Sequence, residues 1–186
     1  MSANNFEVAL KQCLKWEGST FTNDPDDRGG ATKYGVIQTR YDEYRKFKGL
    51  AKQTVRNITM PEVREIYRKY YWDEVQGDRL PQVLDVAVFD AAVNHGPSRA
   101  AKWLQSMLGV MVDGKIGTET IVAAVKATDD EGKVEEKLLA GKFCDRREQF
   151  YEDIAVGNQR KWLKGWMNRL NDLRLLLGLK DGDGVG

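Results

Sequence analysis

The chain has 186 residues, of which 41% are hydrophobic and 31% charged, and its formal net charge is +1. This length and composition suit one compact globular domain or two small, closely packed ones. The near-neutral charge argues against a nucleic-acid-binding protein, and no apolar run approaches the length of a membrane span. With one histidine and two dispersed cysteines, the sequence argues against a zinc site of the Cys/His type, and we expect no metal and no cofactor.

The cysteines and the start of the chain both bear on the cellular compartment. Cys13 and Cys144 lie on apparently helical, apolar faces, where reduced and buried thiols are expected. The first twenty residues lack a basic start followed by an apolar core, so no Sec-type signal is visible. We therefore expect synthesis in the cytoplasm and no stable membrane insertion.

Helical periodicity dominates from the first predicted helix onwards, which covers about residues 4–17. Its apolar residues recur at spacings of three and four along one face: Phe6, Leu10, Cys13 and Leu14. Glu17 continues this apolar stripe, and a turn rich in Asn, Asp, Pro and Gly follows it. After the turn, residues 31–37 are expected to pair as a small β-hairpin around Gly29-Gly30.

Seven further helices are predicted after the hairpin, and one of them has a well-defined start. Thr59 is its expected N-cap and Glu62 completes a capping box. The small, apolar face between Pro81 and the Gly96-Pro97 break is typical of a central buried helix. The predicted helices lie at about 39–47, 59–75, 81–95, 98–108, 118–125, 133–156 and 158–177. The sequence thus predicts a mainly α fold with a small β feature.

The carboxylates around the polar turn point to glycosidic bond cleavage. This reaction needs one protonated carboxyl group for the leaving oxygen and a second carboxylate that orients a water or attacks the sugar. Glu17 suits the first role, because a carboxyl group on an apolar stripe is partly desolvated and desolvation favours its neutral form. Asp24 and Asp26 compete for the second role, although a turn aspartate that binds nearby backbone N–H groups is the alternative for each. The Thr32 hydroxyl is placed to help hold a water, or belongs to a plain strand threonine.

The spacing of Glu17, Asp26 and Thr32 is similar to the Glu–Asp–Thr set of the phage-type lysozymes. The segment from Trp16 to Val36, with Asp27-Arg28-Gly29-Gly30-Ala31-Thr32 at its centre, resembles the opening signature of glycoside hydrolase family 108. That family comprises bacterial and phage N-acetylmuramidases, in which the glutamate of a Glu-Gly-Gly motif is the catalytic acid. The resemblance assigns this role to Glu17, and Ser19 stands where the motif has its second glycine.

Two later blocks extend the resemblance over most of the chain. Residues 85–105 and 109–117 resemble the peptidoglycan-binding region of the family, and residues 160–169 are similar to its closing helix. The resemblance implies a lysozyme-like helical bundle with the hairpin near the catalytic turn. It also implies a catalytic region over 1–84 and a helical peptidoglycan-binding region over 85–178 packed on it as one compact unit. The polar, glycine-rich composition of residues 179–186 predicts a flexible tail.

Candidate substrate contacts are residues whose side chains match a sugar, since aromatic faces pack on C–H surfaces and amides match hydroxyl and N-acetyl groups. They are Asp24, Tyr34, Trp72, Asn94 and His95. Trp72 also lies at helical spacing with neighbouring tyrosines, which is typical of core residues. Asn94 also suits a helix cap, and a lone histidine is more often a hydrogen-bonded structural residue than a catalyst.

The resemblance implies cleavage of the β-1,4 bond between N-acetylmuramic acid and N-acetylglucosamine. We expect a monomer that acts on peptidoglycan glycan strands in the periplasmic wall, as a phage endolysin made in the host cytoplasm. A bacterial muramidase associated with export and a non-catalytic peptidoglycan-binding protein are the alternatives. A peptidoglycan amidase or peptidase needs zinc or a Cys–His pair, and the sequence offers neither.

Overall fold

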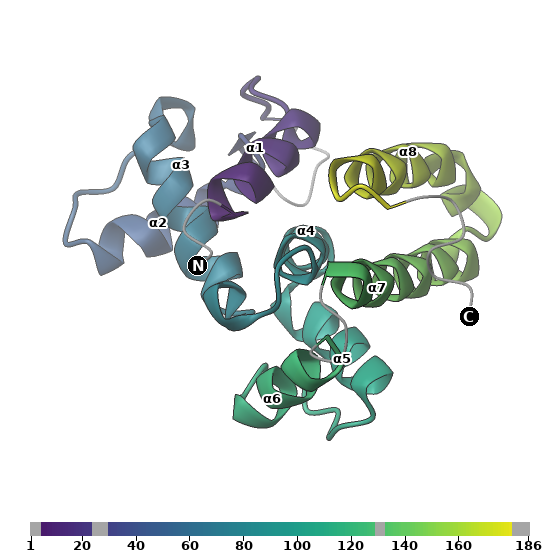
Figure 1. Ribbon diagram of the computed structural model, residues 1–186. Helices are drawn as coiled ribbons and strands as arrows, with labels where there is room; N and C mark the ends of the chain where they lie inside the picture. Colours follow the sequence, from purple (N-terminus) through teal and green to yellow (C-terminus); the bar gives the residue numbers. More distant parts are fainter. Residues whose placement is uncertain (1–4, 24–29, 129–132, 180–186) are drawn as a thin grey trace. The chain divides into compact units, whose positions relative to one another are not determined.

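The computed structural model describes residues 5–23, 30–128 and 133–179, and over these residues the chain is mainly α-helical (Figure 1). The described helices are α1 (Asn5–Glu17), α2 (Gln38–Phe47), α3 (Met60–Tyr67), α4 (Leu84–His95), α5 (Pro97–Leu108), α6 (Thr118–Lys126), α7 (Lys133–Ile154) and α8 (Arg160–Leu176). A two-stranded sheet of β1 (Thr32–Lys33) and β2 (Val36–Ile37) is the small β feature. The predicted fold class is confirmed. None of the helices in these ranges is long and apolar enough to cross a membrane.

The chain divides into two compact units. One comprises Leu10–Tyr70, and the other comprises Met1–Ala9 together with Tyr71–Gly186. The first unit is therefore inserted into the second, and α1 begins in one and ends in the other. The predicted division after residue 84 stays a prediction about function, because these units are defined by packing alone.

In the unit 10–70 the two strands form an antiparallel hairpin in which Thr32 pairs with Ile37 and Lys33 with Val36. The turn between them is made by Tyr34 and Gly35, with φ of 53° and 71°. Positive φ at both central residues matches the right-handed twist of the strands. The turn of this hairpin thus lies after the predicted Gly29-Gly30, of which Gly29 is outside the described residues, because tyrosine at a left-handed turn position is not a recognisable turn signal.

Helices α2 and α3 of this unit are joined by tyrosine–glutamate hydrogen bonds. The Tyr41 hydroxyl donates to Glu62 at 2.9 Å, and the Tyr44 hydroxyl donates to Glu65 at 3.0 Å. Glu62 also accepts from the backbone N–H of Thr59 at 2.9 Å, so the predicted capping box is confirmed. Helix α3 is shorter than predicted, because the chain continues as the π-helical turn η3 (Arg68–Trp72).

In the other unit, α4 is the central element. Each of its first nine residues, Leu84 to Ala92, is buried, which confirms the prediction of a central buried helix. Helices α5 and α7 pack against α4, and α8 lies beside α7 (Figure 1). Gly96 separates α4 from α5, as predicted.

A buried ionic cluster joins three helices of this unit. Arg147 of α7 contacts Asp90 of α4 at 2.6 Å, and Arg169 of α8 contacts the other carboxylate oxygen at 2.9 Å. The two guanidinium groups outweigh the effect of burial and hold the pKa of Asp90 well below its usual range. Asp90 is therefore a charged structural residue.

Both cysteines are free thiols and both are buried, as predicted. Cys13 belongs to α1 and Cys144 to α7. Burial raises the pKa of the Cys144 thiol to about 12. A thiol with such a pKa is protonated and unreactive near neutral pH, which suits a core residue.

Candidate active site

Glu17 lies at the last position of α1, where the helix meets the polar turn. The following Gly18 has a φ of +71°, a conformation that commonly ends helices and that glycine adopts without steric penalty. The Glu17 side chain is half-buried. The dipeptide Glu17-Gly18 therefore ends α1 directly after the residue that carries the candidate catalytic carboxyl group.

The Glu17 carboxyl group lies against the hairpin turn. A methyl group built on Gly35 would lie 2.8 Å from Oε2 of Glu17 and 2.5 Å from the hydroxyl oxygen of Tyr67. Both distances are too short for a real side-chain atom, so only glycine leaves room for the two oxygens on this face of the turn. The hairpin, α1 and α3 thus meet at one corner of the unit 10–70, which we call the Glu17 corner (Glu17, Gly35 and Tyr67).

Tyr67 orders this corner from α3. The residue is buried, and its hydroxyl donates to the backbone carbonyl of Tyr34 at 2.9 Å. That bond ties the left-handed turn residue Tyr34 to α3. The proton of the Tyr67 hydroxyl is used in this bond. Tyr67 is one of the tyrosines at helical spacing with Trp72, which is typical of core residues, and no sequence signal marks its hydroxyl as part of the corner.

Thr32 is placed on β1, within the same hairpin. Its backbone N–H donates to Thr22 at 2.9 Å, and its hydroxyl donates to the carbonyl of Gly30 at 3.1 Å. The hydroxyl oxygen keeps lone pairs that can accept a hydrogen bond from a water. Both the water-holding role and the plain strand role agree with this geometry.

The hairpin is anchored to the 3₁₀ turn η2 (Val55–Asn57). Lys33 donates to the carbonyl of Arg56 at 2.8 Å, and its ammonium lies 5.4 Å from the centre of the Tyr34 ring. The Arg56 guanidinium in turn lies 4.1 Å from the centre of the Phe21 ring. The half-buried Tyr34 ring is therefore held beside the Lys33 ammonium rather than packed into the core.

The two candidate second carboxylates, Asp24 and Asp26, lie outside the described residues. Their predicted roles as turn residue, substrate contact or catalytic base stay predictions.

Asn94 and His95 end α4 in the other compact unit, where both contact the Tyr151 hydroxyl. Asn94 Nδ2 donates to this oxygen at 3.4 Å, Arg147 Nε donates to it at 2.8 Å, and His95 Nε2 lies 3.1 Å from it. Since the tyrosine oxygen already accepts from two donors, its own proton is directed to Nε2 of a neutral imidazole. Asn94 is exposed, so its predicted contact with substrate stays a prediction.

His95 is held in an aromatic cluster. Its ring lies 5.2 Å from that of Trp103 and 5.4 Å from those of Phe150 and Tyr151, centre to centre. Burial, with the nearby positive charges of Arg147 and Arg99, lowers the pKa of His95 to about 3. The imidazole is therefore neutral near pH 7, which suits the structural alternative and provides no acid for catalysis.

The prediction that Trp72 contacts the saccharide is wrong. The side chain is fully buried and packs edge-to-face on Phe6 and Phe89, with ring centres 5.4 and 5.5 Å away. Its indole N–H donates to Asp78 at 3.0 Å. The helical spacing of Trp72 reflected a core position, and no face of its ring is available to a sugar.

Comparison with known proteins finds two matching family models and a similar solved structure. The family model described as glycosyl hydrolase 108 matches residues 10–96, which include the whole Glu17 corner. A second model, described as a predicted peptidoglycan domain, matches residues 99–171. The chain is also similar to a solved structure described as that of Brucella abortus SagA, with 31% sequence identity, a TM-score of 0.72 and 93% of each chain covered. A comparison with curated proteins finds no match.

Proposed function

We propose that this chain, which belongs to the glycosyl hydrolase 108 family, is an N-acetylmuramidase that uses Glu17 as its general acid. Membership of the family makes it a glycosidase, and its peptidoglycan domain identifies peptidoglycan as the polymer on which it acts. The bond proposed is the β-1,4 linkage between N-acetylmuramic acid and N-acetylglucosamine.

The observation that supports this role of Glu17 is the close approach of its carboxyl group to Gly35. A carboxyl group on a glycine face, beside a hydroxyl whose own proton is donated to Tyr34, is held in a defined place and is half-shielded from water. Such positioning is what proton transfer to a glycosidic oxygen requires. Tyr67 and Gly35 position the acid.

In the proposed reaction, Glu17 donates its proton to the leaving oxygen as the bond to the sugar carbon breaks. Asp26, or Asp24 in its place, supplies the second carboxylate, and Thr32 helps to hold the attacking water. This water-mediated route inverts the anomeric centre and needs carboxyl groups about 6.5–9.5 Å apart, whereas a separation of about 5–5.5 Å favours a covalent intermediate and retention. Analysis of the product anomer by NMR distinguishes the two routes.

The test of the acid is Glu17→Gln on purified peptidoglycan. The amide has nearly the same shape but cannot donate the proton, so we expect loss of turnover by at least about a hundredfold with the fold intact. Loss of turbidity and release of reducing ends measure cleavage, and circular dichroism checks the fold. Full activity of this variant would remove Glu17 from the mechanism.

The bond and the second carboxylate are tested separately. New reducing ends without new amino groups indicate a glycosidase, and mass spectrometry of the muropeptides distinguishes N-acetylmuramic acid ends from N-acetylglucosamine ends. Comparison of Asp26→Asn with Asp24→Asn assigns the second carboxylate. If neither change slows turnover by about tenfold, the two-carboxylate scheme is wrong.

We further propose that the enzyme works as a monomer on the periplasmic wall, without nucleic acid as a partner. A phage endolysin is the biological role that we favour, and a bacterial muramidase associated with export is the alternative. Both roles use the same chemistry, so they are distinguished by where the protein acts and when it is made.

A further inference from the structure

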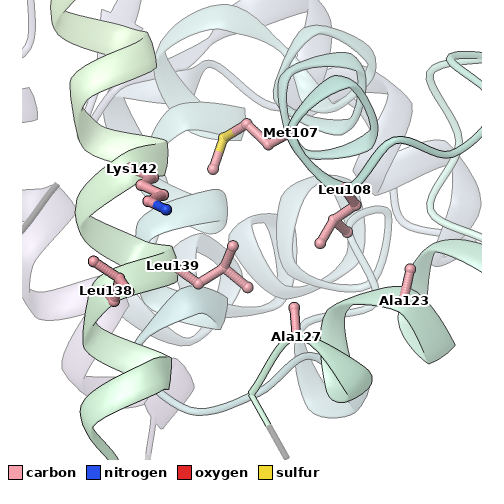
Figure 2. Close-up of a pocket in the computed structure, with 7 residues that line it drawn as sticks. All are labelled: Met107, Leu108, Ala123, Ala127, Leu138, Leu139 and Lys142. Carbon is pink, nitrogen blue, oxygen red and sulfur yellow. The ribbon is translucent and has the colours of Figure 1, made fainter. Parts of the chain in front are cut away.

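The region 99–171 contains an open pocket that the cleavage reaction does not use. It has a volume of about 360 Å³ and lies between α5, α6 and α7 (Figure 2). Its apolar lining consists of Met107, Leu108, Ala123, Ala127, Leu138 and Leu139. This volume is near the lower end of the range of about 300–1,000 Å³ for ligand sites, so it suits a short ligand end rather than a long segment.

Of the lining residues that the structure describes, Lys142 is the charged one. It is half-buried, and Figure 2 shows its ammonium turned towards the space between the helices. Among the described residues, none forms a hydrogen bond or ion pair with this ammonium group. A half-buried ammonium beside an apolar surface attracts an anionic group whose neighbouring atoms are apolar.

Peptidoglycan consists of glycan strands and stem peptides, and only the stem peptides match the chemistry of this lining. A glycan strand presents hydroxyl and acetamido groups, which need hydrogen-bonding side chains and aromatic faces. No residue that lines the pocket within the described ranges has an aromatic ring, a hydroxyl or an amide side chain. A stem peptide presents alanine methyl groups and carboxylates, which match the leucines and alanines on one side and Lys142 on the other.

We infer that this pocket binds the carboxylate end of a peptidoglycan stem peptide, with Lys142 paired to the carboxylate and alanine methyl groups packed on Leu139 and Ala123. The inference rests on the proposed function in that it takes peptidoglycan as the polymer. Binding here would hold the wall by its peptides while the Glu17 corner acts on its sugars.

The experiment is a titration of the full-length, ¹⁵N-labelled protein with acetyl-Lys-D-Ala-D-Ala, followed by NMR. We expect shifts of the backbone amides that line the pocket, including those of Ala123 and Leu139. The same peptide with a C-terminal amide removes only the negative charge, so it should bind about tenfold more weakly.

Three lysine variants test the role of the Lys142 charge. Lys142→Gln should weaken binding of the peptide acid about tenfold, and Lys142→Arg should restore most of it. Lys126→Gln removes the same charge from an exposed residue of α6 that does not line the pocket, and should leave affinity within about twofold.

Several results would overturn the inference: no shifts at the pocket, equal binding of acid and amide, or equal affinity of the Lys142→Gln and Lys126→Gln variants. Shifts at the pocket with chitotetraose instead of the peptide would assign it to glycan. These outcomes are separate from the cleavage assay. Peptide binding without cleavage would contradict the proposed function alone, and cleavage without peptide binding would contradict this inference alone.

Discussion

The two compact units each hold a carboxyl group in a constrained place, but with opposite chemical consequences. Asp90 is fully enclosed and lies between Arg147 and Arg169, so it is fixed as an anion. Glu17 is half-buried and rests on the glycine face of a hairpin turn, beside the hydroxyl of Tyr67. Depth of burial alone therefore does not distinguish the structural carboxylate from the acid that we propose. The groups around each carboxyl are what differ, arginines at Asp90 and a glycine face at Glu17.

Of the two carboxyl groups, Asp90 is the one whose loss we expect to change stability most. Asp90→Asn leaves two buried guanidinium groups without their counter-ion, so we expect the free energy of unfolding to fall by about 3–5 kcal/mol. Urea denaturation measures this loss. Asp145→Asn is the control, because Asp145 is a partly exposed partner of Arg174 and its loss should cost at most about 1 kcal/mol. Equal costs for the two variants would mean that the buried cluster does not hold the helices together.

The proposed positioning of Glu17 by the hairpin turn is tested at Gly35. Gly35→Ala places a methyl group where the Glu17 and Tyr67 oxygens lie, so we expect kcat to fall about tenfold to a hundredfold while KM changes little. Gly49→Ala is the matched control, because Gly49 has nearly the same φ, +68° against +71°, but no atom within 4 Å of the added methyl group. Both variants place alanine at a left-handed backbone position, whereas only Gly35→Ala displaces the Glu17 carboxyl group. If Gly49→Ala slows turnover as much as Gly35→Ala, strain rather than positioning explains the effect.

A third carboxylate, Asp85, sharpens the comparison through pH. Burial raises its pKa to about 6, against an ordinary value of 3.8, although Asn5 and the Val86 N–H donate to it at 2.8 and 2.7 Å. Between these values the folded protein keeps a proton that the unfolded chain has lost, so this contribution to stability falls as pH rises from about 4 to 6. Asp85→Asn removes the ionisation. Relative to the variant, the wild type should lose about 2 kcal/mol of unfolding free energy between pH 4 and pH 7, as measured by urea denaturation. Parallel pH profiles would show that Asp85 ionises freely in the folded protein.

The sequence carries the local features of this fold well. The capping box at Thr59, the buried stripe of α4 and the position of Glu17 at a helix end all follow from spacing within a few residues. What could not be predicted depends on residues far apart in the chain. Asp90 meets arginines 57 and 79 residues away, and Tyr67 meets a turn 33 residues away. Trp72 shows the same limit, because its helical spacing favoured a core position but its packing on the distant Phe6 is what closes the ring to a sugar.

The Asp90 cluster also limits how this protein can be divided. The two family matches meet between residues 96 and 99, which would suggest cutting the chain there to obtain a separate wall-binding module. Such a cut leaves α4 on the other piece. Arg147 and Arg169 would then lie in the interior of an incomplete bundle without Asp90, their counter-ion. A module that carries the wall-binding surface must therefore keep α4, so the hydrolytic portion could be exchanged only at a point before this helix, which leaves α4 with α7 and α8.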